Sequence, residues 1–347
     1  MNVNPELRAF YRGKYALVTG GLGNIGSNLA LALVELGAKV TAMDNRVVGC
    51  GANDHNLQAA GGRVTLWESD IARADEYPCV IESADVVFNL AGEVSHIHSM
   101  LYPARDLAIN TESQIRFLQI VARYAPGKRV VYAGTRQVYG VPQYLPVDEL
   151  HPLAPPDFNG VHKLCATNYH LLLGRLGQID PIVLRLTNVI GPRMAIQSPC
   201  QGFLSVFTRC ALRGQPLVVY GDGTQLRDPV YVDDIVDVLL RAGAVREPRR
   251  RVLNVGSTEP LTIMEIAHQF SNEAGLAAPE CRPFPSGRAA IDVGGYYTDT
   301  AACHQDLGWR ATTSFSAAVR STLDFYERHI DHYLAPGAGP CCALGHL

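Results

Sequence analysis

Three glycines, each three residues after the last, join a strand-like run to a helix-like run near the amino terminus. Gly20, Gly23 and Gly26 lie between the apolar run 15–19 and the amphipathic stretch 25–36. In a βα unit, glycines at this spacing allow a tight turn, a close approach of the backbone to a pyrophosphate and tight packing of the helix on the strand. The positive end of the helix favours the phosphate charge. This loop predicts a dinucleotide-binding α/β fold.

An acidic residue follows at the end of the second strand-like run. Asp44 closes the run 39–44, where its carboxylate can accept hydrogen bonds from both hydroxyls of a dinucleotide ribose. The same charge would repel a 2′-phosphate, so NAD is favoured over NADP. Arg46 lies near enough to accommodate that phosphate, which keeps NADP as the alternative cofactor at this point.

The first half of the chain alternates short apolar runs with helix-like stretches. The strand-like runs are nearly continuous in Val, Ile, Leu and Phe, which is typical of a sheet covered on both faces. They lie at 15–19, 39–44, 64–67, 85–90, 129–133 and 182–188. Helix-like stretches lie between them at 25–36, 72–83, 103–124 and 161–176. This β-α-β-α order predicts a parallel sheet with helices on both of its faces.

The pattern changes after the last of these strands. Shorter strands are expected at 217–220 and 252–255, and helices at 202–212, 232–242, 262–273 and 314–328. We therefore predict a Rossmann-type, doubly wound parallel sheet with a smaller, interleaved C-terminal α/β substrate lobe. The Rossmann domain takes residues 1–190 with a strand returning near 251–257, the lobe takes 191–250 and 258–332, and 333–347 form a flexible tail.

Composition narrows the class of protein. The 347 residues are 47% hydrophobic with a formal net charge of −3, which suits a large globular core and offers no basic surface to nucleic acid. No stretch is long and apolar enough to cross a bilayer, and the amino terminus lacks the apolar core of a signal peptide. Nine scattered cysteines, an odd number, fit a reducing cytoplasm better than a disulfide framework. We expect a cytoplasmic protein with neither nucleic-acid nor membrane partners.

Beyond the glycine loop, a series of short motifs follows in order along the chain. They are Asp70-Ile71, Asn89-Leu90-Ala91-Gly92, Asn110, the segment 133–140 (AGTRQVYG), the segment 185–193 (RLTNVIGPR) and the segment 221–234 (GDGTQLRDPVYVDD). Together with Gly-x-x-Gly-x-x-Gly, the series resembles the extended short-chain dehydrogenase/reductase family, in its branch of nucleotide-sugar epimerases and dehydratases. The resemblance runs from Tyr15 to about Arg328 and is specific to nucleotide-sugar enzymes, although not to one reaction.

This resemblance implies a cofactor site and a substrate site. NAD would contact residues of the glycine loop, the ends of the following strands and a lysine, and no metal is expected. The implied cofactor residues are Gly20, Gly23, Asn24, Ile25, Gly26, Asp44, Asn45, Asp70, Ile71, Leu90, Ala91, Gly92 and Lys163. Arg227 and Arg288 are the candidates for a nucleoside diphosphate, because a diphosphate needs cations with several donors. Asn188 is the candidate for hydrogen bonds to the diphosphate or the sugar, and a UDP-sugar is favoured.

The catalytic motif of the family is incomplete in this chain. Members use a Tyr that exchanges a proton with a sugar hydroxyl, a Lys four residues later, and a Ser or Thr that hydrogen-bonds the reacting oxygen. Lys163 and Thr135 match the last two, but Asn159 stands at the Tyr position. One helical turn separates Asn159 from Lys163, so both should face the same site. An amide does not ionise near neutral pH and cannot be the general base.

Three interpretations of this substitution compete. Another group could transfer the proton, with Glu93, just after the Asn89–Gly92 motif, or His162, next to Lys163, as candidates. The reaction could use a substrate group or ordered water without a protein base. Catalysis could also be lost, leaving a regulator that binds NAD and a nucleotide sugar. Retention of Thr135 and Lys163 favours an active enzyme.

The expected function is NAD-dependent epimerisation of a nucleotide-diphosphate sugar at C4, through transient oxidation to a keto sugar. Dehydratases and decarboxylases of the family resemble T-D-E or T-E-x-Y-G after the Thr, and here Arg136 and Gln137 follow it. The alternatives are an NAD(P)H-dependent ketoreductase, a nucleotide-sugar dehydratase and the non-catalytic regulator. The resemblance also implies a homodimer, formed through the helices at 103–124 and 158–176.

Overall fold

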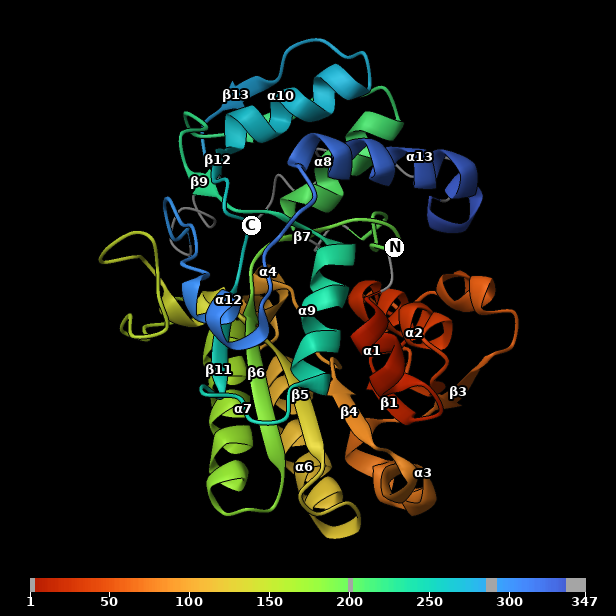
Figure 1. Cartoon of the computed structure of the whole chain (residues 1–347). Helices are drawn as coiled ribbons and strands as arrows, with labels where there is room; N and C mark the ends of the chain where they lie inside the picture. The colour runs from red at the N-terminus through yellow and green to blue at the C-terminus, as the bar shows by residue number, and fades with distance from the viewer. Residues whose placement is uncertain (1–3, 199–201, 285–291, 335–347) are drawn as a thin grey trace.

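The computed structural model describes residues 4–198, 202–284 and 292–334. At its centre lies a seven-stranded sheet with the strand order β11-β6-β5-β4-β1-β2-β3 (Figure 1). The strands are β1 (Tyr15–Thr19), β2 (Lys39–Asp44), β3 (Val64–Glu68), β4 (Val86–Asn89), β5 (Arg129–Thr135), β6 (Asp180–Leu186) and β11 (Val252–Val255). Neighbouring strands of this sheet pair in parallel, which confirms the predicted doubly wound fold.

The order of the strands reverses between β1 and β4. From β1 the chain proceeds outward to β2 and β3, then crosses back to β4 on the other side of β1 and continues to β5 and β6. The connections that follow β1 and β4 therefore run in opposite directions from the carboxyl ends of these two strands. Doubly wound sheets bind ligands in the crevice at such a reversal, so the fold itself marks where the site should lie.

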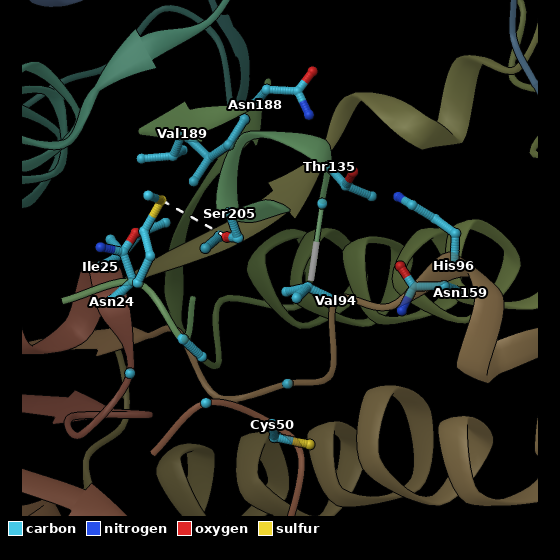
Figure 2. Close-up of a pocket in the computed structure, with 18 of the residues that line it drawn as sticks. Asn24, Ile25, Cys50, Val94, His96, Thr135, Asn159, Asn188, Val189 and Ser205 are labelled. Carbon is cyan, nitrogen blue, oxygen red and sulfur yellow. Dashed lines mark hydrogen bonds between the residues drawn. The ribbon is translucent and has the colours of Figure 1, made fainter. Parts of the chain in front are cut away.

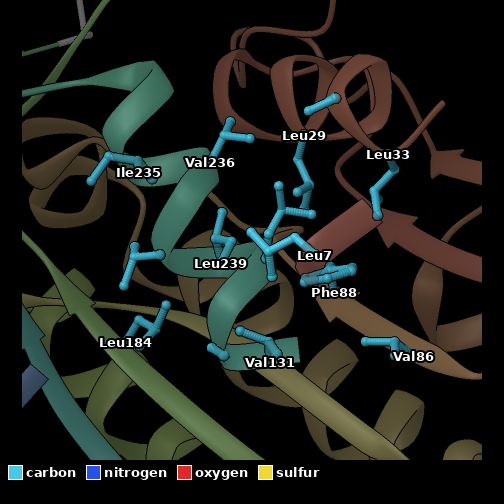
Figure 3. Packing of buried hydrophobic residues seen from close by; sticks show 14 of the residues in the cluster. Leu7, Leu29, Leu33, Val86, Phe88, Val131, Leu184, Ile235, Val236 and Leu239 are labelled. Carbon is cyan, nitrogen blue, oxygen red and sulfur yellow. The ribbon is translucent and has the colours of Figure 1, made fainter. Parts of the chain in front are cut away.

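Helices cover both faces of the sheet. One face carries α1 (Pro5–Tyr11), α2 (Asn24–Glu35) and α9 (Val232–Ala244), and the other carries α3 (Pro78–Ser83), α6 (Ser113–Tyr124) and α7 (Phe158–Arg175). Figure 3 shows Leu29 of α2 and Leu239 of α9 gathered with Phe88 and Val131 of the sheet. Because these side chains are almost fully buried, the central strands lose contact with water on both faces.

A second core holds the smaller lobe. It packs α8 (Phe203–Leu212), α10 (Ile263–Glu273) and α13 (Phe315–Tyr333) around the short pair β8 (Val218–Tyr220) and β13 (Glu280–Arg282). The helix α10 begins with a capping box, since Thr262 accepts the backbone N–H of Glu265 and the Glu265 carboxylate accepts that of Thr262. In Figure 1 this lobe lies beyond the carboxyl end of the sheet.

The two cores are divided differently from the sequence-based domain limits. The helix α9 and the helix α12 (Ala301–Leu307) fall in the stretches expected to form the lobe, yet their apolar faces join the core of the sheet domain. Ile235 and Leu239 of α9 and Trp309 after α12 are almost fully buried there. The periodicity of α9 predicts a helix with one apolar face but does not specify which core receives that face.

The stretch expected to form one helix at 103–124 is interrupted. It consists of α5 (Pro103–Leu107), a π-helical segment η3 (Ala108–Glu112) and α6. The wider turn brings Asn110 to the backbone of Glu93, with Asn110 Nδ2 donating to the Glu93 carbonyl at 3.1 Å. Over 4–198, 202–284 and 292–334, none of the helices combines the length and apolar character needed to cross a bilayer.

Candidate active site

A cavity of about 710 Å³ extends from the carboxyl ends of the sheet strands into the lobe. Its walls come from the glycine loop, the ends of β2, β4 and β5, the helix α7 and the lobe residues around α8 and β8 (Figure 2). Every residue predicted to contact the cofactor lines it, from Gly20 of the loop to Lys163 of α7. The structure thus brings together positions spread over more than the first third of the chain.

The glycine loop has no room for side chains. A Cβ on Gly26 would lie 2.2 Å from the carbonyl oxygen of Gly20, and Gly20 itself has a φ of 67°, a conformation that L side chains rarely adopt. Gly23 precedes the first residue of α2 as its N-cap and has no side-chain cap. The N–H groups at the start of α2 therefore remain available to a phosphate. These observations fit the pyrophosphate of a dinucleotide.

Asp44 stands at the end of β2 where a ribose is expected. Its Oδ2 accepts the N–H of Leu22 at 3.1 Å, and its Oδ1 accepts the N–H of Arg46 at 2.8 Å. The Arg46 guanidinium contacts Asp54 and donates from Nε to Glu68 at 2.9 Å. Because Asp54 and Glu68 already hold the Arg46 guanidinium, a 2′-phosphate would have to displace these carboxylates before it could pair with Arg46.

Asp70 organises the part of the cavity where the family resemblance places the adenine. Asn45 Nδ2 donates to Asp70 Oδ2 at 2.7 Å, and Asp70 Oδ1 caps the following helical turn by accepting the N–H of Ala72 at 2.8 Å. Ile71 is buried next to it on the same wall. On the opposite side Thr19 Oγ1 accepts the N–H groups of Leu90 and Ala91 at 3.0 and 3.1 Å. This bonding fixes the strand end that the cofactor would contact.

Lys163 is the deeply placed cation of the cavity. It lies on α7 beneath Gly92, where an added Cβ would lie 2.7 Å from Asn110 Oδ1 and 3.1 Å from Lys163 Nζ, so the glycine leaves room for both side chains. Burial lowers the pKa of Lys163 to about 8, against a smaller raising effect of Asp106. Lys163 is therefore expected to lose its positive charge at modestly alkaline pH, where an ordinary lysine is still charged.

Asn159 occupies the Tyr position, and its amide NH2 group makes two hydrogen bonds within the protein. Its Nδ2 donates to the carbonyl of Glu93 at 2.9 Å and to Asp106 Oδ2 at 3.0 Å. In Figure 2 the amide oxygen lies on the side of Thr135, and both residues line the cavity. Asn159 can therefore accept a hydrogen bond from a ligand while its amino group is held by the protein.

The two groups predicted as replacement bases lie elsewhere. Glu93 is 3% exposed and is not among the residues that line the cavity; its carboxylate lies 3.2 Å from His98 Nδ1 and 3.6 Å from Arg105 Nε. His162 points away from Lys163, with its Nδ1 2.7 Å from Asp106 Oδ1. Residues adjacent on a helix project about 100° apart, so His162 and Lys163 cannot share one wall. The proton-transfer roles of both stay predictions that the geometry does not favour.

The lobe end of the cavity is cationic. Arg227 is buried, and burial, together with the nearby Arg136, lowers its pKa to about 10 although Asp292 and Asp228 oppose this. Its Nη1 donates to the carbonyl of Leu226 at 2.7 Å, and its Nη2 lies 3.4 Å from Asp292 Oδ1. Arg136 stacks over Tyr296 and reaches Asn188 Oδ1 at 3.5 Å. Arg288 lies outside the described residues.

The start of the cofactor helix is bonded to the substrate segment. The carbonyl of Pro192 accepts Asn24 Nδ2 at 2.6 Å and Asn28 Nδ2 at 3.1 Å. Arg193, whose φ is 71°, donates from Nη1 to Asn28 Oδ1 at 2.7 Å. A non-glycine residue in this conformation is uncommon, and here its side chain is fixed across the junction of the two halves.

Residues 16–256 match the family model of the NAD dependent epimerase/dehydratase family. The chain belongs to that family. It is 28% identical to a putative UDP-glucose 4-epimerase of Methanocaldococcus jannaschii, over 90% of this chain and 98% of that protein. It is 31% identical to a UDP-N-acetyl-alpha-D-glucosaminuronate decarboxylase of Bacillus cytotoxicus, over 79% of this chain and 86% of that protein. A solved UDP-glucose 4-epimerase with UDP-glucose from Thermotoga maritima superposes with a TM-score of 0.81 at 27% identity, covering 91% of this chain and 99% of that one.

Membership of the NAD-dependent epimerase/dehydratase family agrees with the site. This family member is an NAD-dependent enzyme that acts on nucleotide sugars, and its glycine loop, Asp44 and Lys163 would hold the NAD. Among the titratable side chains on the cavity wall that the sequence did not mark, His96 stands beside Asn159. No motif marks this histidine, because its nearest charged partner, Asp157, is far away in the sequence. His96 is recognised only by its contact with Asp157, which forms when the chain folds.

Exchanging Asp44 tests the ribose end of the site. Asp44→Asn is expected to weaken NAD binding by ~10-fold, because a carboxylate that accepts two hydroxyls is replaced by an amide with one acceptor. The preference for NAD over NADP should narrow at the same time, since the repelling charge is gone. Calorimetric titration with both dinucleotides measures this, with the exposed Asp75→Asn as a control for loss of charge. An unchanged NAD affinity would place the ribose elsewhere.

Proposed function

We propose that the protein is an NAD-dependent 4-epimerase of a nucleotide-diphosphate sugar, with a UDP-sugar favoured, and that its active site works without the usual Tyr. One observation carries the proposal: Thr135, Asn159 and Lys163 line the same cavity as the glycine loop and the cationic end at Arg227. A sugar whose diphosphate is held at that end can therefore reach the cofactor side of the cavity. The UDP-glucose epimerases among the relatives support the choice of substrate.

The distribution of carboxylates supports epimerisation over dehydration. Elimination of water needs an acid and a base next to the reacting carbons, as in the T-D-E pattern. Within the described part of the chain, the carboxylates that line the cavity are Asp44, Asp70 and Asp292. The first two belong to the adenosine end, and Asp292 contacts Arg227. Beside Thr135 stand Arg136 and Gln137 instead, and epimerisation needs only reversible oxidation at one carbon.

The residues divide the work of the reaction as follows. When bound, NAD would supply reversible hydride transfer at the sugar carbon. Thr135 Oγ1 and the amide oxygen of Asn159, which lie toward each other on the cavity wall, can hydrogen-bond hydroxyl groups of the sugar. Lys163 supplies a positive charge close to the cofactor and the reacting oxygen. Arg227 holds the diphosphate, so the sugar can turn while the nucleotide stays bound.

The test is a substrate panel. Purified protein with NAD is incubated with UDP-, GDP-, CDP- and dTDP-sugars, and the products are resolved by NMR. A change of configuration at C4 without net consumption of NAD is the expected result. Net oxidation of NAD(P)H with a keto substrate would overturn the proposal in favour of a reductase. Binding of nucleotide sugars without any turnover would overturn it in favour of a regulator.

We also propose a homodimer formed through α7 and the helices at 103–124. Large apolar side chains are exposed on these elements, with Val161 at 46%, Leu172 at 44% and Leu107 at 46% relative exposure. Val161 and Leu172 are separated by about three helical turns and so lie on one face of α7. Apolar side chains gathered in this way usually mark a protein–protein contact.

Leu172→Glu is expected to shift the protein from dimer to monomer. A carboxylate at the centre of an apolar contact would be buried without a partner and weaken association by ~100-fold or more. Sedimentation velocity or light scattering over a concentration series measures this. Leu150→Glu is the matched control, because Leu150 is 88% exposed on a loop away from both helices. A wild-type protein that is monomeric at all concentrations would contradict the proposed dimer.

A further inference from the structure

A histidine and a buried aspartate meet on the cavity wall beside Asn159. His96 is the first residue of α4 (His96–Leu101), preceded by the N-cap Ser95, whose Oγ accepts the N–H of His98 at 3.1 Å. The His96 side chain is 39% exposed and lines the cavity together with Thr135, Asn159 and Lys163. In Figure 2 its ring extends beside Asn159 toward Thr135. It is therefore reachable by a ligand in the cavity.

Asp157 holds the other side of this ring. Its side chain is 0% exposed, and its Oδ2 lies 2.9 Å from His96 Nδ1, at ion-pair distance although oblique for a straight hydrogen bond. It also accepts Gln137 Nε2 at 2.8 Å and the N–H of Gly160 at 2.7 Å. Burial raises the pKa of Asp157, but His96 and these donors outweigh burial and bring the pKa below its usual value. The partner of His96 is therefore a carboxylate anion.

The arrangement leaves one ring nitrogen for the cavity. Nδ1 lies next to Asp157 and the ring lines the cavity, so Nε2 is the nitrogen that a ligand can use. A carboxylate on one nitrogen sets the tautomer and stabilises the imidazolium that forms when the other nitrogen takes a proton. Glu93 and His162 lack this placement, because neither lines the cavity. Asn159 cannot ionise.

We propose that His96 is the proton-transfer residue of this enzyme and replaces the Tyr that Asn159 displaced, with Asp157 as its positioning residue. In the oxidation half-reaction the O–H bond of the sugar hydroxyl breaks, and Nε2 of His96 takes the proton. The oxygen's electron pair forms the carbonyl, while the hydride on the same carbon leaves to NAD. After the keto sugar turns, the hydride returns to the other face and His96 gives the proton back to the oxygen. Protons and electrons balance over the cycle.

This inference rests on the proposed epimerase function, and the variants are chosen to separate the two. His96→Gln keeps a polar side chain of similar reach but cannot carry a proton. Its turnover is expected to fall by ~100-fold or more, with the affinities for NAD and the UDP-sugar within a few-fold of wild type. His268→Gln, an exposed histidine of α10, is the matched control and should keep the wild-type rate. Glu93→Gln is measured in parallel as the competing base.

Chemical rescue decides between a proton carrier and a structural role. His96→Ala is assayed with and without added imidazole, and imidazole is expected to restore a large part of the lost rate. Failure of rescue in a folded His96→Ala protein that still binds NAD would overturn the proposal. A wild-type rate in His96→Gln, or a loss confined to Glu93→Gln, would overturn it as well and leave the epimerase function standing.

A readout independent of turnover covers the case in which the panel shows no reaction. In spectra of protein with ¹⁵N-labelled histidine rings, the signal missing from His96→Gln identifies His96. UDP-glucose is expected to move its Nε2 resonance, whereas UDP alone should not, because only the sugar reaches this wall. Asp157→Asn, which keeps a good N-cap for α7, should change the ring tautomer. An Nε2 resonance indifferent to UDP-glucose, or a tautomer indifferent to Asp157→Asn, would contradict the assignment.

Discussion

Lys163→Met is expected to abolish turnover and, at the same time, to raise the stability of the protein. The ammonium stands in the cavity beside Thr135 and Asn159, where charge changes during the reaction, and preorganised charge of this kind is worth about 10²–10³ in rate or more. Binding of NAD should weaken too, because Lys163 is the cation on the cofactor side of the cavity. Methionine fills a similar volume without the charge, so the change isolates the ammonium.

The stability gain follows from the lowered pKa. Burial lowers the pKa of Lys163 from its ordinary value of 10.5 to about 8, so the folded state disfavours the charged form. Between these two pH values the unfolded chain binds more protons, and the stability of wild type rises with pH. Below about pH 8 the cost of burying the charge is present in full. Removing the charge is therefore expected to add on the order of 1–3 kcal/mol at neutral pH.

Denaturant unfolding at pH 7 and at pH 10 measures both effects. The stability difference between Lys163→Met and wild type should be large at pH 7 and small at pH 10. Lys39→Met, an exposed lysine at the start of β2, is the control and should show no such difference. Retained turnover in Lys163→Met would contradict the site, and a difference independent of pH would contradict the origin of the stability gain.

Gly26→Ala is expected to reduce the affinity for NAD by ~100-fold or more, because a Cβ 2.2 Å from the Gly20 carbonyl forces the loop to move. The turn is closely packed on its other side as well, since a Cβ added to Gly20 would lie 3.0 Å from the carbonyl oxygen of Leu90. The shift must displace the N–H groups that would face the pyrophosphate. UDP-sugar binding should change little, because Arg227 lies away from this turn, next to Leu261 at the lobe end of the cavity.

Titration of the purified variant with NAD and with UDP-glucose tests this separation. Gly295→Ala serves as the control for a glycine-to-alanine change, since Gly295 does not line the cavity and a Cβ there would meet its nearest atom at 3.5 Å, an ordinary contact. Equal losses of NAD and UDP-glucose affinity would point to general unfolding of the variant. Wild-type NAD affinity would mean that the dinucleotide does not approach this turn.

Local features of the site could be predicted from the sequence. The glycine loop, Asp44, Asp70 and the Leu90–Gly92 segment each follow a predicted strand, and strand ends of a parallel sheet meet at one edge. The cavity-lining residues confirm all of these positions as neighbours. The predictions for β1 and β2 also match the observed limits of those strands.

The proton-transfer chemistry could not be predicted in the same way. Gly92 and Val94 line the cavity and Glu93, between them, does not, because an irregular loop has no periodicity that tells which side chains turn inward. The pairing of His96 with Asp157 depends on how α4 packs near the start of α7. The π-helical segment before α6 likewise comes from tertiary contacts of Asn110, since its residues alone read as ordinary helix.

The bonds between α2 and the Pro192–Arg193 turn have a kinetic meaning. Asn24 and Asn28 hold the carbonyl of Pro192, and Arg193 returns a bond to Asn28. A lobe that swings open at this junction must break three hydrogen bonds or drag the cofactor helix with it. If NAD leaves through such an opening, its exchange with the solvent is expected to be slow. Hydrogen bonds of this kind would keep NAD bound over many catalytic cycles.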